Sequence, residues 1–206
     1  MYINAAVYED LYLKGQPIEV IEREVAKMRT ELARLKRKME SPEYESGDYA
    51  KYPSEQESIS ATREYLNAAL LYLAELKGDN SVLTEEERTA AVVRSLRMQI
   101  KSITLAIRNN TYVIDMQKAF IQVISNGAVI ETHECSRPQL LSVITDLRIE
   151  EWREVYSPED YGCTLVDPVY WSLEVNYGDA MAPRMYRGEG VYPYNFGLLR
   201  RLLHID

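Results

Sequence analysis

A regular seam of apolar residues between positions 18 and 39 constrains the fold of this chain more than any other feature. The apolar residues recur at alternating steps of three and four: Ile18, Ile21, Val25, Met28, Leu32, Leu35 and Met39. Three heptads of this spacing predict a long amphipathic helix that packs along its length against another helix. Pro17 suits the first turn, and Ser41-Pro42 ends the helix because a residue before proline disfavours helical angles.

Two further seams follow along the chain. The second predicted helix begins after Ser54, which forms a capping-box pattern with Glu57, and it ends at Gly78. The third begins at Thr84, which forms a second capping-box pattern with Glu87, and it is expected to continue to Asn109-Asn110. Their apolar positions are Ile59, Thr62, Leu66, Ala69, Leu73 and Leu76, and then Val93, Leu96, Ile100, Ile103 and Ile107. We therefore expect an antiparallel three-helix bundle over residues 1–110, and a homodimer through the heptad helices stays open.

The apolar period changes from helical spacing to two after residue 110. The segments 111–116, 119–125 and 128–134 alternate between apolar and polar residues, and Asn126-Gly127 is a strong signal for a type I′ hairpin. A short helix is expected after Ser136, strands at 169–177 and 184–188, and a last helix near 196–205, capped by Asn195. The predicted fold class is α+β: the helical bundle, followed over residues 111–206 by a small mixed β-sheet domain with two short helices.

Two segments of the second half need separate interpretation. Residues 148–156 are compatible with either a strand or a helical turn. Gly188-Glu189-Gly190 lacks the third glycine of a dinucleotide fingerprint and the Lys-Ser/Thr of a phosphate-binding loop. We interpret these glycines as the point where the chain leaves a sheet edge.

The composition is typical of a globular cytoplasmic protein. The chain has 206 residues, of which 46% are hydrophobic and 27% charged, and no apolar run approaches the length of a membrane span. Glu9 and Asp10 lie where an export signal would be basic and then apolar. Two cysteines are too few for a disulfide framework. The 16 tyrosines against 2 phenylalanines favour half-exposed aromatic positions or an interface.

The net charge of -8 is unevenly distributed about residue 110. Residues 1–110 hold 16 Lys/Arg and 18 Asp/Glu, whereas residues 111–206 hold 8 and 14, which gives net charges of -2 and -6. An acidic C-terminal half should repel nucleic-acid backbone and attract basic protein surfaces.

The residue types that carry most enzyme chemistry are scarce. His133, His204, Cys135 and Cys163 are the only histidines and cysteines, and their spacing matches no standard zinc site. Cys163 lies in a predicted strand, where a thiol usually fills the core. We therefore expect no catalytic residue, metal or cofactor, although a carboxylate pair in a cleft would escape this reasoning.

Several stretches resemble uncharacterised proteins of gut Firmicutes and their mobile elements. These are "LARLKRKMESPEY" with "TREYLNAALLYL", and "LRIEEWREVY", "WSLEVNYGD" and "GEGVYPYNFGLLRRLL". The last stretch is similar to the pattern G-x-N-x-Y-P-x-N-F, with Gly190 in place of the asparagine. The resemblance implies a bacterial mobile-element setting and transfers no catalytic residues.

These observations predict a non-enzymatic interaction protein, such as a counter-defence inhibitor of the anti-CRISPR type, that binds a basic partner such as a nuclease or a nucleoprotein complex. The predicted contact residues are acids and tyrosines of one segment: Glu150, Glu151, Glu154, Tyr156, Glu159, Asp160 and Tyr161. The alternative is a nucleic-acid-binding accessory protein that uses the basic run Arg34, Lys36, Arg37 and Lys38. An enzyme of unknown class is the second alternative.

Overall fold

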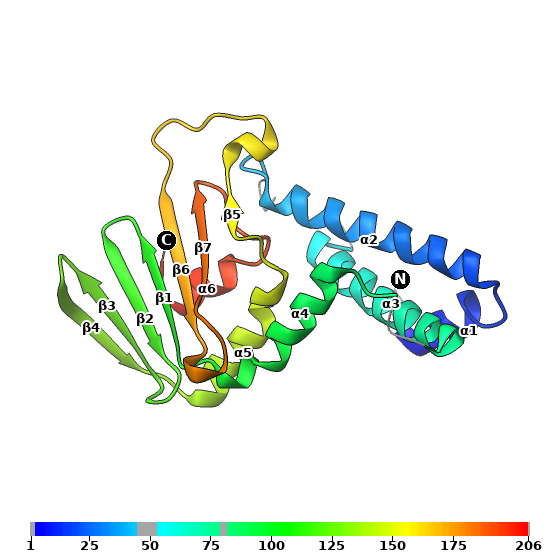
Figure 1. The fold of residues 1–206 in the computed structure, drawn as a ribbon. Coiled ribbons are helices and arrows are strands. Elements are labelled where there is room, and N and C mark those ends of the chain that lie inside the picture. The colour runs from blue at the N-terminus through cyan, green and yellow to red at the C-terminus, as the bar shows by residue number, and fades with distance from the viewer. Residues whose placement is uncertain (1–2, 45–52, 79–81, 206) are drawn as a thin grey trace. The chain divides into compact units, whose positions relative to one another are not determined.

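The chain forms two compact units in a computed structural model that describes residues 3–44, 53–78 and 82–205 (Figure 1). The first unit is Met1–Arg88 and the second is Thr89–Asp206. The connections between the predicted helices, which the sequence places at Glu43 to Pro53 and Gly78 to Leu83, lie mostly outside the described residues.

Helices α2 and α3 of the first unit confirm the first two predicted heptad helices. The unit contains α1 (Ala5–Tyr12), α2 (Ile18–Glu40), α3 (Glu55–Lys77) and the beginning of α4 (Glu85–Ser95). The apolar seams of α2 and α3 pack on each other in one core, formed by Leu13, Ile21, Val25, Met28, Leu66, Ala69, Leu70 and Leu73. Because these side chains bury one another within the chain, the buried part of the seam is not available for the homodimer that the heptads left open.

Local capping interactions fix where these helices begin. The Ser54 hydroxyl accepts from the Glu57 N–H at 3.2 Å, while the Glu57 carboxylate accepts from the Ser54 N–H at 2.8 Å. Thr84 and Glu87 form the same reciprocal pair at the start of α4, as predicted. Each pair satisfies backbone donors that a helix start leaves without a partner.

Helix α1 is an element that the heptad pattern did not predict. Asn4 caps it through a 2.8 Å bond from the Val7 N–H. The ring of Tyr8 stacks on that of Tyr65 in α3 with centroids 4.3 Å apart, and the Tyr65 hydroxyl donates to the Ile3 carbonyl at 2.8 Å. Tyrosine pairs therefore hold α1 against α3, which is one reason for the high tyrosine content.

We predict that Leu66→Ala lowers the free energy of unfolding of the first unit by about 2–5 kcal/mol, because the side chain is 5% exposed and leaves a cavity. Leu71→Ala on the same helix is the matched control, since Leu71 is 69% exposed and should change stability by less than about 0.5 kcal/mol. Chemical denaturation followed by helical circular dichroism measures both. Equal effects of the two substitutions would contradict the packing.

The prediction of a third helix as far as residue 110 is wrong beyond Ser95. Helix α4 ends there, a 3-10 turn follows at Arg97–Gln99, and residues 102–107 form strand β1. The apolar residues of this segment satisfy two periods: Ile100, Ile103 and Ile107 have helical spacing, but Ile103, Leu105 and Ile107 alternate as in a strand. Pairing with two neighbouring strands selects the second period. The three-helix bundle of residues 1–110 is therefore not confirmed.

The second unit is built on one seven-stranded sheet in the order β4-β3-β2-β1-β6-β7-β5. All neighbours are antiparallel except β5 and β7, which are parallel. The strands are β1 (Ser102–Ile107), β2 (Asn110–Asp115), β3 (Phe120–Ser125), β4 (Ala128–Glu134), β5 (Val155–Tyr156), β6 (Tyr170–Asn176) and β7 (Arg184–Glu189). Asn126 and Gly127 both have positive φ, which confirms the predicted hairpin between β3 and β4. The α+β class is thus confirmed.

Helices α5 (Arg137–Leu147) and α6 (Gly197–Leu202) pack on one face of this sheet, and Figure 1 shows α6 behind β6 and β7. The core between these helices and the sheet contains several fully buried aromatic side chains, including Tyr156, Tyr177, Tyr186 and Phe196. Burial raises the pKa of Tyr186 well above its usual value, and its hydroxyl donates to the Ile149 carbonyl at 3.2 Å. The expectation that the tyrosines are half-exposed is therefore wrong for these three, which serve as core aromatics where phenylalanine is scarce.

Candidate functional site

The predicted contact residues lie on the connection between α5 and β6. This connection consists of a 3-10 turn at Ile149–Glu151, strand β5, and a second 3-10 turn at Pro158–Tyr161. Residues 148–156 are therefore a helical turn followed by a short strand, so each of the two readings that the sequence left open describes part of the segment. The segment contains both buried and exposed positions, and this divides the predicted site into two groups.

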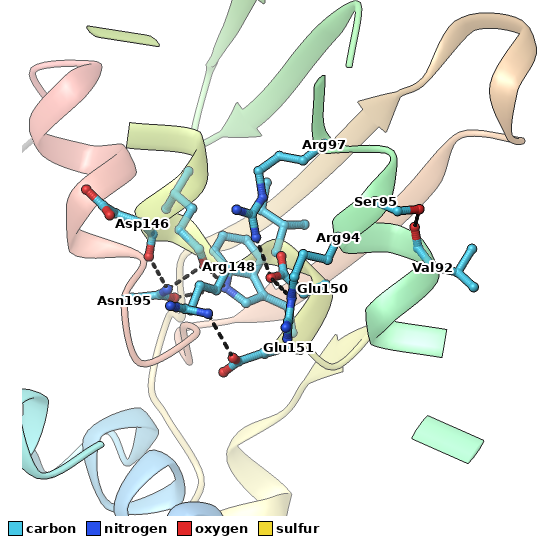
Figure 2. A network of polar contacts seen from close by, with 12 residues as sticks. Val92, Arg94, Ser95, Arg97, Asp146, Arg148, Glu150, Glu151 and Asn195 are labelled. Atoms are coloured by element: carbon cyan, nitrogen blue, oxygen red, sulfur yellow. Dashed lines mark hydrogen bonds and ion pairs between the residues drawn. The ribbon is translucent and has the colours of Figure 1, made fainter. Parts of the chain in front are cut away.

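Glu150 is a buried ion-pair acceptor, contrary to its predicted place on an exposed surface. Its side chain is only 3% exposed, and its Oε1 atom lies 3.2 Å from Arg94 Nε and 2.5 Å from Arg97 Nη2 (Figure 2). Burying a carboxylate is costly unless cations and hydrogen bonds compensate. The two arginines supply that compensation and connect α4 and the turn after it to the turn after α5.

A second buried network joins this turn to the C-terminal loop. Trp152 Nε1 donates to Asn195 Oδ1 at 2.8 Å and to the Leu147 carbonyl at 3.0 Å. The Asn195 amide nitrogen donates in return to the carbonyls of Asp146, at 3.2 Å, and Leu147 (Figure 2). Asn195 therefore does not cap the last helix as predicted, because α6 starts at Gly197 and its N-terminal cap position is Phe196.

Glu151 and Tyr156 are also committed to internal contacts. Glu151 is 10% exposed, lies 3.8 Å from Arg148 and accepts from the Tyr194 hydroxyl at 3.2 Å. Tyr156 is 1% exposed, and its hydroxyl accepts from the Arg153 N–H at 2.9 Å. Neither side chain is exposed as the contact prediction requires, because both are largely buried and bonded within the chain.

The exposed group consists of Glu154, Glu159, Asp160 and, half-buried, Tyr161. Arg153 links this group, since its guanidinium donates to Asp160 at 2.8 Å and to the Tyr161 hydroxyl at 2.9 Å, and it lies 4.6 Å from the centre of the Tyr156 ring. Glu154 is 74% exposed, with Arg184 at 3.7 Å. We call the set Arg153, Glu154, Val155, Glu159, Asp160 and Tyr161 the β5 surface.

We predict that Glu150→Ala destabilises the second unit by about 2–4 kcal/mol, because it leaves Arg97 with its charge largely buried. Glu154→Ala should cost less than about 0.5 kcal/mol, because Glu154 is 74% exposed and Arg184 lies 3.7 Å away. Chemical denaturation of the two variants compares them directly. If Glu150→Ala were as mild as the control, the ion pairs would not hold the segment.

The position of the boundary between the units changes the charge argument. Residues 1–88 hold 12 Lys/Arg and 18 Asp/Glu, net -6, and residues 89–206 hold 12 and 14, net -2. The segment 89–110 contributes four cations and no acid to the second unit, and two of these cations are Arg94 and Arg97. The excess of acid therefore lies in the helical unit, contrary to the expectation for the two halves divided at residue 110.

The basic run on α2 is largely matched by acids. Arg34 donates to Glu31 at 2.7 and 2.8 Å, and Lys38 is paired with Glu55 of α3. Lys36 and Arg37 also have interactions within the chain. The alternative contact to nucleic acid would have to compete with these pairs for phosphate.

The histidines and cysteines do not gather into a metal centre within residues 3–44, 53–78 and 82–205, where no group of three or more potential ligands could hold an ion. His133 Nε2 lies 3.0 Å from Glu131 Oε1, and the rings of His133 and His204 are 6.3 Å apart. Cys135 and Cys163 are both free thiols and half-buried, and burial raises the pKa of the Cys135 thiol.

The glycines of Gly188-Glu189-Gly190 have a packing role. A Cβ atom at Gly188 would lie 2.3 Å from Trp171 Nε1, which donates to the Val191 carbonyl at 2.8 Å. Gly190 has a φ of +63°, and a Cβ there would lie 2.4 Å from Leu165 Cδ1. Close packing and a left-handed turn at the end of β7 therefore account for both glycines.

We predict that Gly188→Ala lowers the free energy of unfolding by about 1–3 kcal/mol, because the added methyl group must displace the Trp171 ring. Gly197→Ala in α6 is the control: its new Cβ would have no neighbour nearer than 3.7 Å, and alanine should stabilise the helix by up to about 1 kcal/mol. Thermal unfolding of both variants tests the opposite signs. If Gly188→Ala left the stability unchanged, the end of β7 could accommodate the added methyl group without cost.

Comparison with known proteins returns no relative: no family model, curated protein or solved structure matches this chain. The resemblance to mobile-element proteins of gut Firmicutes stays a prediction. No helix among the described residues is both long and apolar enough to span a bilayer.

Sequence reasoning missed the residues that hold the predicted segment in place. Arg94 and Arg97 pair with Glu150, Arg153 pairs with Asp160, and Asn195 bonds to Trp152 between these acids. Arg153 was recognisable as a cation between acids. The other three are separated from their partners by more than 40 positions, and no local pattern indicates such pairing.

Proposed function

We propose that this protein acts as a non-enzymatic binding protein for a basic protein partner, in the manner of a counter-defence inhibitor of the anti-CRISPR type. The resemblance to mobile-element proteins supplies the biological setting. What the fold contributes is a defined surface: the β5 surface of Arg153, Glu154, Val155, Glu159, Asp160 and Tyr161.

The observation that carries the proposal is the way in which this surface is anchored. Trp152, Tyr156 and Pro158 are buried, and they lie between the exposed residues of the same segment. Side chains that are held in place before binding lose less conformational entropy on association. The exposed residues also have the character of interface contacts: an arginine, a tyrosine and carboxylates in one segment with an apolar side chain, Val155, that is 46% exposed.

A binding partner has to be identified before the proposal can be tested, and it must have a basic surface. Capture from a bacterial lysate supplies candidates, and duplex DNA serves as the competing ligand for the nucleic-acid alternative. Association kinetics of a purified partner at several salt concentrations then measure the electrostatic contribution.

We predict that Glu154→Lys with Glu159→Lys slows association at least about tenfold at low salt and flattens its salt dependence, because exposed charges act mainly on the association rate. Tyr161→Ala should mainly speed dissociation. Asp146→Lys with Asp179→Lys is the matched control, since it changes the net charge equally at two other exposed positions of the second unit.

The results separate the alternatives. If the control variant slowed association as much as the reversal at Glu154 and Glu159, the β5 surface would not be the contact. Tight binding of plain duplex DNA that is lost on reversal of Arg34 and Arg37 would favour the accessory nucleic-acid-binding protein instead.

A further inference from the structure

Strand β4 forms one edge of the sheet and has no neighbour on its outer side among the described strands. All of its residues except His133 are exposed, including Val129 and Ile130, which are 54% and 62% exposed. An exposed edge of this kind offers backbone donors and acceptors to another strand.

The hydrogen bonding to β3 determines which backbone groups face outward. The Cys135 N–H donates to the Ala119 carbonyl at 2.8 Å, and the register continues with His133 opposite Ile121 and Glu131 opposite Val123. The backbone N–H and C=O groups of successive residues in a strand point to opposite neighbours. Those of Cys135, His133 and Glu131 point toward β3, so those of Thr132 and Glu134 point away from it. The outer edge is thus centred on Thr132.

We propose that two copies of this chain pair through β4, antiparallel and about a two-fold axis at Thr132. In this register the Thr132 residues of both copies exchange backbone hydrogen bonds. Glu131 of each copy then lies opposite His133 of the second copy, on the same face of the sheet. This inference does not depend on the proposed function.

Charge complementarity selects this register and favours a second copy as the occupant. The Glu131 and His133 side chains of one chain already lie 3.0 Å apart, so they share a face and can interact as donor and acceptor. A two-fold axis at Glu131 or at Glu134 would place like carboxylates directly opposite each other, which is destabilising. An axis at His133 would pair the two histidines and leave Glu131 without its complement.

The same geometry limits the assembly to two copies. The register between β3 and β4 shifts between Val123 and Ile124, so the uninterrupted part of β4 around Thr132 is limited to residues 131–134. A bulge of this kind restricts further strand addition. An isologous contact also uses the same edge of both copies, so it closes on itself.

Sedimentation velocity of the full chain across a range of concentrations tests the pairing. We expect a reversible shift from the monomer of 23.8 kDa to twice that mass. Thr132→Pro removes an outward N–H without breaking a bond to β3, and it should weaken dimerisation at least about tenfold, whereas Thr132→Val, which keeps the N–H, should not. Circular dichroism verifies that each variant is folded.

A charge exchange provides a second, independent test. His133→Glu places two glutamates opposite each other at both ends of the contact and should weaken the dimer, and the double variant Glu131→His with His133→Glu should restore it. A wild-type chain that stays monomeric at high concentration overturns the proposal. A dimer that survives Thr132→Pro, or one that the double variant fails to restore, overturns it as well.

Discussion

The second unit depends on the ion pairs of one buried carboxylate, that of Glu150. This carboxylate pairs with Arg94 and Arg97, which precede the first strand of the sheet in the sequence. Glu150 itself follows helix α5, so strands β1 to β4 separate it from the two arginines along the chain. A charge at this depth is tolerated only with such partners. It therefore fixes where the chain enters the unit relative to the segment that carries the β5 surface.

The helical hairpin and most strands could be predicted because their signals are local. The seams of α2 and α3, the capping boxes at Ser54 and Thr84, and the Asn126-Gly127 turn each depend on residues close in sequence. The wrong prediction of a helix at residues 96–107 arose because the local pattern there is ambiguous. Ile103 and Ile107 fit both a helix and a strand, and pairing with β2 and β6 decides between them.

The predicted site could be recovered only in part. Sequence reasoning grouped all acids and tyrosines of residues 150–161 as one set of contact residues, without separating buried from exposed positions. Burial separates Glu150 and Tyr156 from Glu154 and Asp160, and it depends on contacts with residues far along the chain. The charge asymmetry depended in turn on the boundary at residue 110. With the boundary after Arg88, the cations of residues 89–110 belong to the sheet unit.

The distribution of aromatic residues has a consequence for observing the two units. Both tryptophans, Trp152 and Trp171, are buried in the core of the second unit, and the first unit contains tyrosine but no tryptophan. Selectively excited indole fluorescence therefore reports on the sheet unit alone. Far-ultraviolet ellipticity, by contrast, is dominated by the long helices α2 and α3. Without any label, the two signals can follow the melting of each unit in one sample and reveal whether the units unfold together or in sequence.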